Sequence, residues 1–127
     1  MPDARLEILI VDDDPTLARS IARTLHLHRA TVETDPAAAL QRVRGGERFD
    51  VILCDARMPV VDGAGVLAAS RELSDPPIFI LMSAYDDLGD VDADAVLYKP
   101  FHASQLLGLI AVLIARRRGH APESTQA

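Results

Sequence analysis

Several features typical of other protein classes are missing from this sequence. Its one cysteine, Cys54, cannot form an internal disulfide, which fits a reducing cytoplasm and favours a small buried side chain. Lysine is almost absent too: the chain has one lysine, Lys99, and twelve arginines. The net charge is −6 and the only basic run, 116–118, is short, so no nucleic-acid surface is expected. These arginines are expected to end a helix and to complement its dipole.

Long apolar runs are absent as well. The longest, "LLGLIAVLIA" at 106–115, has ten residues, against the roughly 20 that a membrane-spanning helix needs. The N-terminal stretch "MPDARLEILIVDDD" has an acidic flank and lacks the pattern of a signal peptide. We therefore expect a cytoplasmic protein with neither a membrane nor a nucleic acid as partner.

Length and composition are those of one compact domain. The chain has 127 residues, of which 49% are apolar and 25% are charged. We expect the domain to span 1–118, and the small polar stretch "GHAPESTQA" at 119–127 to be disordered. With no effector domain after it, the domain is expected to act as a stand-alone module.

Short apolar runs alternate with segments of helical periodicity. Continuous β-branched-rich runs predict strands at 6–11, 50–54 and 77–82, and weaker runs add 30–34 and 95–98. Helices are predicted from Pro15 onward, from Pro36 to the glycines at 45–46, over 63–73 and over 103–118. Asp14 is the expected N-cap of the first helix. This alternation predicts an α/β fold, a doubly wound five-stranded parallel sheet with helices on both faces.

Polar side chains follow the predicted strands at the point where each ends. Asp12 and Asp13 follow the first strand, Asp55 the third, Ser83 the fourth and Lys99 the fifth. Ligand sites of such sheets lie outside the carboxyl ends of the strands, so these side chains are expected to converge. Carboxylates held close together repel unless a cation neutralises them. Oxygen ligands without convergent cysteine or histidine suit Mg²⁺ or Mn²⁺.

Lys99 is informative because every other basic side chain is an arginine. A compact charge on a flexible stem, placed at a strand end before a proline, can hold a transferred phosphoryl group in the acidic pocket. Ser83 offers a hydroxyl at the end of the neighbouring strand, placed to bond the same oxygens. The plainer interpretations are a surface cation for Lys99, a turn residue for Ser83 and a helix cap for Asp14.

Four segments together resemble the response-regulator receiver domain of two-component signalling. They are "ILIVDDDP", "DVILCDARMPVVDG", "FILMSA" and "LYKPF", in the order typical of that family and within a resemblance that covers 6 to about 117. Each motif alone is weak, but the four in order are specific. The resemblance implies a flavodoxin-like fold with strand order 2-1-3-4-5. It also implies that the chain takes a phosphoryl group from a histidine kinase or phosphotransfer protein.

The resemblance assigns a role to each residue of the acidic pocket. Asp55 is the implied phosphoacceptor, and Lys99 the phosphate-binding lysine. Ser83 is the implied switch hydroxyl. The implied Mg²⁺ ligands are Asp13 directly, Asp12 mainly through water, Asp55 and the backbone carbonyl of Arg57. The bond from Lys99 to Pro100 is usually cis in this family. Such a domain is no enzyme in the usual sense, although it catalyses its own magnesium-dependent phosphorylation and dephosphorylation.

The sequence departs from the family between the fourth and fifth strands. Ser83 and Lys99 are only sixteen positions apart, and the intervening "AYDDLGDVDADA" lacks helical periodicity. We therefore predict that the helix usually found there, the family's fourth, is absent or reduced to a turn. An alternative, a calcium loop of alternating aspartates, lacks the glycine that such a loop needs at its sixth position.

Other family positions differ as well. Val96 replaces the aromatic switch residue, and Tyr98, two positions on, could take part of that role or simply cover the sheet. Arg57 and Tyr85 lie where the family controls access of water and hence the lifetime of the phosphate.

A missing helix is expected to uncover one face of the fourth and fifth strands. A second copy or an output partner could cover it, with the last helix contributing to the contact; alternatively, the acidic segment folds back as cover. Two further functions stay open beside phosphoryl acceptance. One is a phosphorylation-independent scaffold. The other is a phosphatase, which would want an aspartate where Arg57 stands.

Overall fold

The computed structural model describes residues 5–84 and 91–119, in which strands and helices alternate along the chain. Each predicted element is confirmed, with ends that shift by one or two residues. The elements in order are β1 (Glu7–Val11), α1 (Pro15–Thr24), β2 (Arg29–Glu33), α2 (Pro36–Arg44), β3 (Val51–Asp55), α3 (Gly63–Arg71), β4 (Ile78–Ser83), β5 (Ala95–Tyr98) and α4 (Ala103–Arg117).

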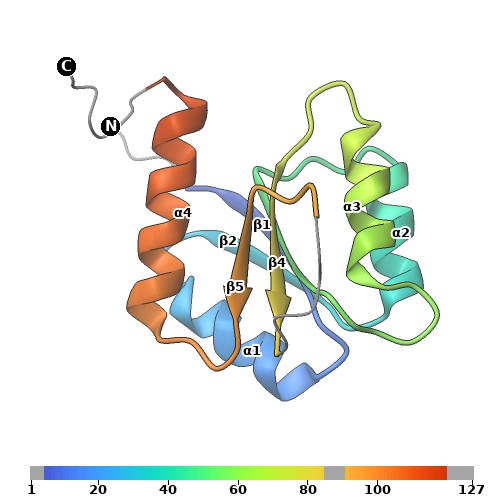
Figure 1. Cartoon of the computed structure of the whole chain (residues 1–127), viewed down its shortest axis with the longest axis horizontal. Helices are drawn as coiled ribbons and strands as arrows, with labels where there is room; N and C mark the ends of the chain where they lie inside the picture. The colour runs from blue at the N-terminus through green and yellow to red at the C-terminus, as the bar shows by residue number, and fades with distance from the viewer. Residues whose placement is uncertain (1–4, 85–90, 120–127) are drawn as a thin grey trace.

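The five strands form one parallel sheet in the order β2-β1-β3-β4-β5. Helices α1 and α4 cover one face of this sheet, and α2 and α3 cover the other (Figure 1). The predicted doubly wound, flavodoxin-like fold is therefore confirmed.

Aspartates begin three of the four described helices. Asp14 accepts hydrogen bonds from the backbone N–H groups of Thr16 and Leu17 at 3.0 and 3.3 Å. Asp35 and Asp62 cap α2 and α3 in the same way. These bonds satisfy N–H groups that have no partner within the helix, and they hold each strand-to-helix turn in place.

Alternate residues of the central strands feed two separate cores. On the α1 and α4 face, Ile8, Leu53 and Ile80 pack against Ile21 and Ile110. Successive side chains of a strand point to opposite sides, so the residues between these positions pack on the opposite face of the sheet. That second core includes Leu9, Ile52, Cys54, Phe79 and Leu81 from the strands and Val43, Val66 and Leu67 from α2 and α3.

The connection from β4 to β5 contains no helix in its described part, residues 84 and 91–94. Helix α4 follows β5 and corresponds to the predicted last helix. In this described part, the structure agrees with the prediction that the helix before β5 is absent or reduced to a turn; residues 85–90 lie outside the described residues. In its place, Val91 and Ala93 pack against the core on the α2 and α3 face, together with Val96 of β5.

Arg71 at the end of α3 holds this segment down. Its Nη2 donates to the backbone carbonyl of Asp92 at 2.5 Å and lies 3.5 Å from Oδ2 of Asp94. The same Asp94 oxygen accepts the backbone N–H of Phe79 at 2.7 Å. The described part of the acidic segment thus covers the sheet face, as the second interpretation of the sequence expected.

Helix α4 is apolar along most of its length but buries only one side. Leu106, Ile110 and Leu113 are buried, whereas Leu107 and Val112 are 43% and 36% exposed. Among the residues described, no helix is both long and apolar enough to cross a membrane. The predicted disordered tail lies outside the described residues, except for Gly119.

Candidate functional site

The carboxyl edge of the sheet brings the strand-end side chains together. Strand pairing places Val11 beside Cys54, Asp55 beside Met82 and Ser83 beside Tyr98. The polar residues that end β3 and β4, and those that follow β1 and β5, therefore lie along one edge. This convergence follows from parallel pairing alone, as the sequence predicts.

Lys99 lies between the two buried carboxylates. Its Nζ is 3.1 Å from Oδ2 of Asp12 and 3.2 Å from Oδ1 of Asp55. Asp12 is fully buried and Asp55 is 9% exposed. One ammonium group therefore offsets only part of the charge of two carboxylates, which lie at the ends of different strands.

Burial and charge act against each other at this site. Burial raises the pKa of Asp55, the charge of Asp12 raises it further, and Lys99 only partly offsets both. Burial alone would lower the pKa of Lys99, but its hydrogen bond and ion pair with Asp12, and those with Asp55, raise it above the ordinary value. Lys99 is therefore held firmly charged, whereas the Asp55 carboxylate keeps unsatisfied negative charge.

Three carboxylates can hold a metal ion at this edge. One oxygen each of Asp12, Asp13 and Asp55 lies within 4.8 Å of the others. Asp13 is exposed, so it offers a face of the cluster to solvent, while Asp12 is oriented by the backbone N–H of Asp14 at 3.0 Å. An all-oxygen set of this kind fits Mg²⁺ or Mn²⁺, and the residues present therefore fit the predicted metal.

The loop after Asp55 is packed tightly against the site. The backbone of Arg57 donates a hydrogen bond to the Asp55 carboxylate, and the N–H of Gly63 donates to the carbonyl of Ala56 at 3.0 Å. A Cβ atom on Gly63 would lie 2.6 Å from the carbonyl oxygen of Asp55. Only glycine allows α3 to start this close to the end of β3.

Val60, in the same loop, was not singled out by the sequence. Its φ is 70°, and the N–H of Val61 donates to the carbonyl of Pro59 at 2.7 Å around it. The side chain is 97% exposed. A β-branched residue in this left-handed region is strained. No residue type in "MPVVDG" predicts a left-handed turn at Val60.

The remaining predicted residues lie at the end of β4, in β5 and directly after β5, except for one outside the described residues. Ser83 is buried at the end of β4, and its carbonyl accepts the backbone N–H of Lys99 at 2.7 Å. Val96 is partly buried against the core, whereas Tyr98 is 49% exposed. The peptide bond before Pro100 is cis. Tyr85 lies outside the described residues.

Cys54 is fully buried, as the sequence suggested. Burial raises the pKa of its thiol, and the negative charges of Asp55 and Asp12 raise it further. The thiol is therefore neutral and acts as a small apolar side chain.

Comparison with known proteins agrees with this geometry. The family model described as the response regulator receiver domain matches residues 8–111. The chain belongs to the response-regulator receiver family. Among curated proteins, this receiver domain is 36% identical to the transcriptional regulatory protein PrrA of Mycobacterium tuberculosis, over 94% of this chain and 54% of PrrA. It is 32% identical to CutR of Streptomyces coelicolor, over 85% of this chain and 53% of CutR.

Solved receiver domains share the fold. The receiver domain of the Francisella response regulator 1452 aligns with a TM-score of 0.78 at 27% identity, over 89% of this chain and 99% of that one. The receiver domain of the sensor histidine kinase PA1611 from Pseudomonas aeruginosa aligns with a TM-score of 0.72 at 29% identity, over 84% of this chain and 95% of that one. The latter structure has a magnesium ion coordinated in its active-site cleft.

The receiver domain spans about half the length of these curated relatives. They are named as transcriptional regulators, but the similarity covers only part of each. The expectation that nucleic acid is not a partner therefore concerns the residues of this chain alone.

Proposed function

We propose that this receiver domain accepts a phosphoryl group on Asp55 from a phosphohistidine of a histidine kinase or phosphotransfer protein in the cytoplasm. The observation that carries this proposal is the position of Lys99 Nζ, 3.1 Å from Asp12 and 3.2 Å from Asp55. A cation between two carboxylates of a partly open cluster is placed to hold oxygens of an incoming phosphoryl group.

The chemistry needs a nucleophile, charge neutralisation and an exit for the leaving group. An oxygen of the Asp55 carboxylate attacks phosphorus, and the bond between phosphorus and the histidine nitrogen breaks, with its electron pair staying on the imidazole. Burial and the charge of Asp12 raise the pKa of Asp55, so its carboxylate is poorly satisfied and reacts readily. Lys99 then moves its hydrogen bond from the carboxylate to the transferred oxygens. Water later hydrolyses the acyl phosphate.

A divalent ion belongs to this mechanism. Asp12, Asp13 and Asp55 would hold Mg²⁺ or Mn²⁺, with the backbone carbonyl of Arg57 as a further ligand. When bound, the ion supplies positive charge to the phosphoryl oxygens. Ser83, buried at the end of the neighbouring strand, would bond one of these oxygens and carry the change to its loop. Arg57 and Tyr85 would control the access of water to the acyl phosphate. Tyr98 would take part of the switch role of the aromatic residue that Val96 replaces.

The test is phosphorylation by a small donor. The full chain is incubated with Mg²⁺ and acetyl phosphate, or with beryllofluoride, and followed by intact mass and by amide NMR spectra. We expect one phosphoryl group per chain in the wild type and none in Asp55→Asn. Chelation of the metal is expected to abolish the adduct, since the carboxylates then lack a neutralising ion.

The alternative function is a scaffold that works without phosphorylation. Wild-type protein with neither an adduct nor amide shifts would favour the scaffold and contradict the proposal. An adduct that persists in Asp55→Asn would place the acceptor on another residue. The phosphatase alternative has less support, because Arg57 stands where its general acid would be.

Phosphorylation would be read out through β4, β5 and α4. Leu107 and Val112 of α4 and Tyr98 of β5 leave apolar surface exposed on these elements, so a second copy or an output partner could bind there. Light scattering at high concentration, with and without beryllofluoride, distinguishes the two. A dimer that Leu107→Glu dissociates would support self-association, and a monomer under both conditions would exclude it.

A further inference from the structure

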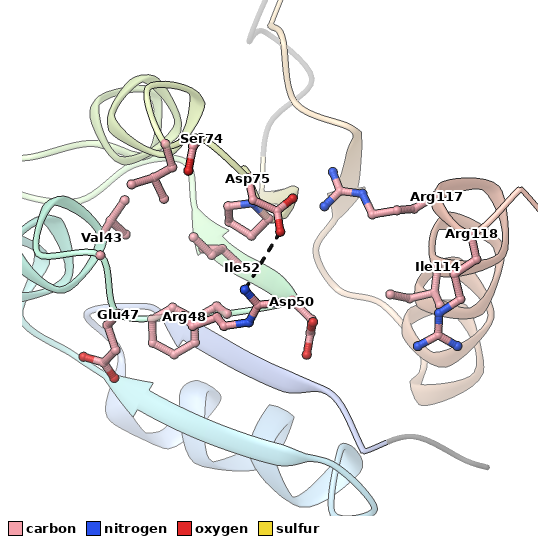
Figure 2. A pocket seen from close by; sticks show the side chains of 14 residues that line it. Val43, Glu47, Arg48, Asp50, Ile52, Ser74, Asp75, Ile114, Arg117 and Arg118 are labelled. Carbon is pink, nitrogen blue, oxygen red and sulfur yellow. Dashed lines mark ion pairs between the residues drawn. The ribbon is translucent and has the colours of Figure 1, made fainter. Parts of the chain in front are cut away.

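A cavity of about 350 Å³ lies at the opposite end of the sheet from Asp12 and Asp55. Figure 2 shows the side chains that line it. It opens at the amino-terminal ends of β3 and β4, where Asp50 and Pro77 precede the two strands. Its walls come from the end of α2 with the following loop, from β3, from the loop between α3 and β4, and from the end of α4. A volume of this size is in the range of small-molecule sites.

The inner wall of the cavity is apolar. Phe49 and Ile52 line it from the loop before β3 and from β3 itself. Leu73 lines it from the loop after α3, and Ile114 from α4. Figure 2 shows Ile52 deep in the cavity, with the charged side chains arranged around its rim. A ligand that fills the cavity must therefore have an apolar body.

Two acidic groups of the rim, Glu47 and Asp50, are engaged with residues outside the cavity. Both carboxylate oxygens of Glu47 accept from Nη1 of Arg42, at 3.1 and 3.0 Å. Oδ2 of Asp50 accepts the backbone N–H of Glu7 at 2.8 Å. Asp75 faces Arg48, but the two charges are 4.0 Å apart and their side chains are 78% and 82% exposed. Such an exposed pair is weak and opens easily.

Two arginines of the rim lack a carboxylate partner within residues 5–84 and 91–119. Nη1 of Arg117 donates to the backbone carbonyl of Pro76 at 2.6 Å, which fixes the side chain over the cavity but leaves its charge uncompensated. Arg118 follows on the same helix end and also lines the cavity. Figure 2 shows the Arg117 side chain reaching from α4 toward Asp75 and Arg48, whereas the Arg118 side chain leaves the same helix end in a different direction.

We propose that this cavity binds a small amphipathic anion, a flat apolar group that carries one carboxylate or phosphate. The apolar body lies against Phe49 and Ile52, and the anionic oxygens accept hydrogen bonds from Arg117, with Arg118 adding positive charge from the same helix end. A guanidinium presents parallel N–H donors that match the geometry of carboxylate and phosphate oxygens. Arg48 joins them when its weak pair with Asp75 opens. This site is separate from Asp55 and independent of phosphoryl acceptance.

The test is a titration of the ¹⁵N-labelled full chain with 2-naphthoate, followed by amide and arginine side-chain NMR signals. Its neutral analogue, 2-naphthalenemethanol, tests the need for charge, and inorganic phosphate tests the need for an apolar body. We expect saturable shifts with 2-naphthoate at Arg48, Ile52 and Arg117. No shifts are expected at Asp12 or Asp55, and both control compounds should bind more weakly.

Two matched variants sharpen the test. Arg117→Gln removes a lining charge and should weaken 2-naphthoate binding about tenfold, the equivalent of one charge-assisted hydrogen bond. Arg116→Gln removes an equal charge from the neighbouring position, which does not line the cavity, and should leave affinity unchanged. Thermal unfolding checks that both variants fold, and Arg118→Gln replaces Arg117→Gln if the latter does not.

Three results would overturn the proposal. The first is the absence of saturable shifts around the cavity. The second is equal binding of the neutral analogue, which would reduce the site to an apolar hollow. The third is equal weakening by Arg116→Gln, which would show only a diffuse effect of positive charge at the end of α4.

Discussion

At the carboxyl edge of the sheet, the buried carboxylates of Asp12 and Asp55 share one partly buried ammonium group. At the amino edge, where the strands begin, Arg48 and Asp75 form an exposed pair 4.0 Å apart. The difference in environment decides what the charges can do. Coulomb interactions are weak and screened in water but strong in a partly desolvated cluster. Charges at the carboxyl edge can therefore act on a substrate, while this pair at the amino edge stays close to solvent.

The amino edge uses its polar side chains in another way. Nδ1 of His28 accepts the backbone N–H of Leu6 at 3.1 Å. A carboxylate oxygen of Asp50 accepts the N–H of Glu7, and one of Asp94 accepts that of Phe79. Each acceptor satisfies a backbone group where a strand begins or is about to begin. These side chains stabilise the sheet, whereas Asp12, Asp55 and Lys99 at the carboxyl edge contact one another.

The largest expected difference between the edges comes from removing one cation at each. Lys99→Met leaves Asp12 and Asp55 buried without a counter-charge, so we expect the free energy of unfolding to fall by about 4 kcal/mol at neutral pH without divalent ions. Arg48→Met removes an exposed charge and should change it by less than about 0.5 kcal/mol. Urea denaturation in a chelating buffer measures both. Equal losses would mean that burial does not separate the edges.

The second prediction concerns the close packing at the carboxyl edge. Gly63→Ala would place a Cβ atom 2.6 Å from the Asp55 carbonyl oxygen and 2.9 Å from Cα of Ala56, and backbone atoms cannot move aside cheaply. We expect a loss of about 3 kcal/mol in the free energy of unfolding. In Gly108→Ala the added Cβ meets nothing within 4 Å, so helix propensity should raise stability by about 1 kcal/mol. Chemical denaturation of both variants checks the opposite signs.

A third prediction tests the backbone acceptors of the amino edge. Asp94→Ala leaves the N–H of Phe79 without its carboxylate acceptor and should cost about 1.5 kcal/mol of unfolding free energy. The matched change Asp92→Ala removes a side chain that is 94% exposed and 3.8 Å from Arg71, and should cost less than about 0.5 kcal/mol. Similar losses in the two variants would show that the hydrogen bond to Phe79 contributes little.

The smallest expected effect is a dependence on pH at His28. Burial lowers the pKa of His28 below the ordinary value of 6.5, and the charge of Arg5 lowers it further. The folded state therefore favours the neutral ring, which accepts from Leu6. The stability that this provides is complete above the unfolded pKa and is lost as pH falls through the folded pKa.

Unfolding free energies from about pH 7.5 to about pH 5 measure this effect. The wild type should lose more stability than His28→Gln, whose amide oxygen can accept a hydrogen bond but does not titrate. Parallel curves for the two proteins would assign the acid sensitivity to other groups.

Much of the fold follows from local patterns. Continuous apolar runs placed the five strands within one residue, and Asp14 with Pro15 marked the start of α1 as the structure has it. The carboxyl ends of parallel strands meet at one edge of the sheet for any conformation of the loops. The sequence alone therefore predicted that Asp12, Asp55 and Lys99 lie close together. The segment between Ser83 and Lys99 was predicted to lack a full helix because its aspartates and Gly89 oppose helix formation.

The contacts at the amino edge of the sheet could not be predicted from local sequence patterns. Asp50 and Glu7 are 43 positions apart, and Asp94 and Phe79 are 15 apart, so no local pattern links acceptor and donor. The cavity beside Arg117 draws its walls from three segments that are far apart in the chain. The strained turn at Val60 likewise depends on how tightly the loop after β3 packs, since no residue type there requires a left-handed conformation.

The sequence by itself determined the order of strands and helices and the set of groups at the carboxyl edge, because side-chain periodicity is local and the carboxyl ends of parallel strands meet at one edge of a sheet. Only the tertiary structure decided how the sheet is covered near β5 and which charges are free. Arg71 holds the acidic segment over the core, and Arg117 stands over a cavity without a carboxylate partner among the residues described. Both depend on the packing of elements far apart in the chain, where contact is set by three-dimensional fit.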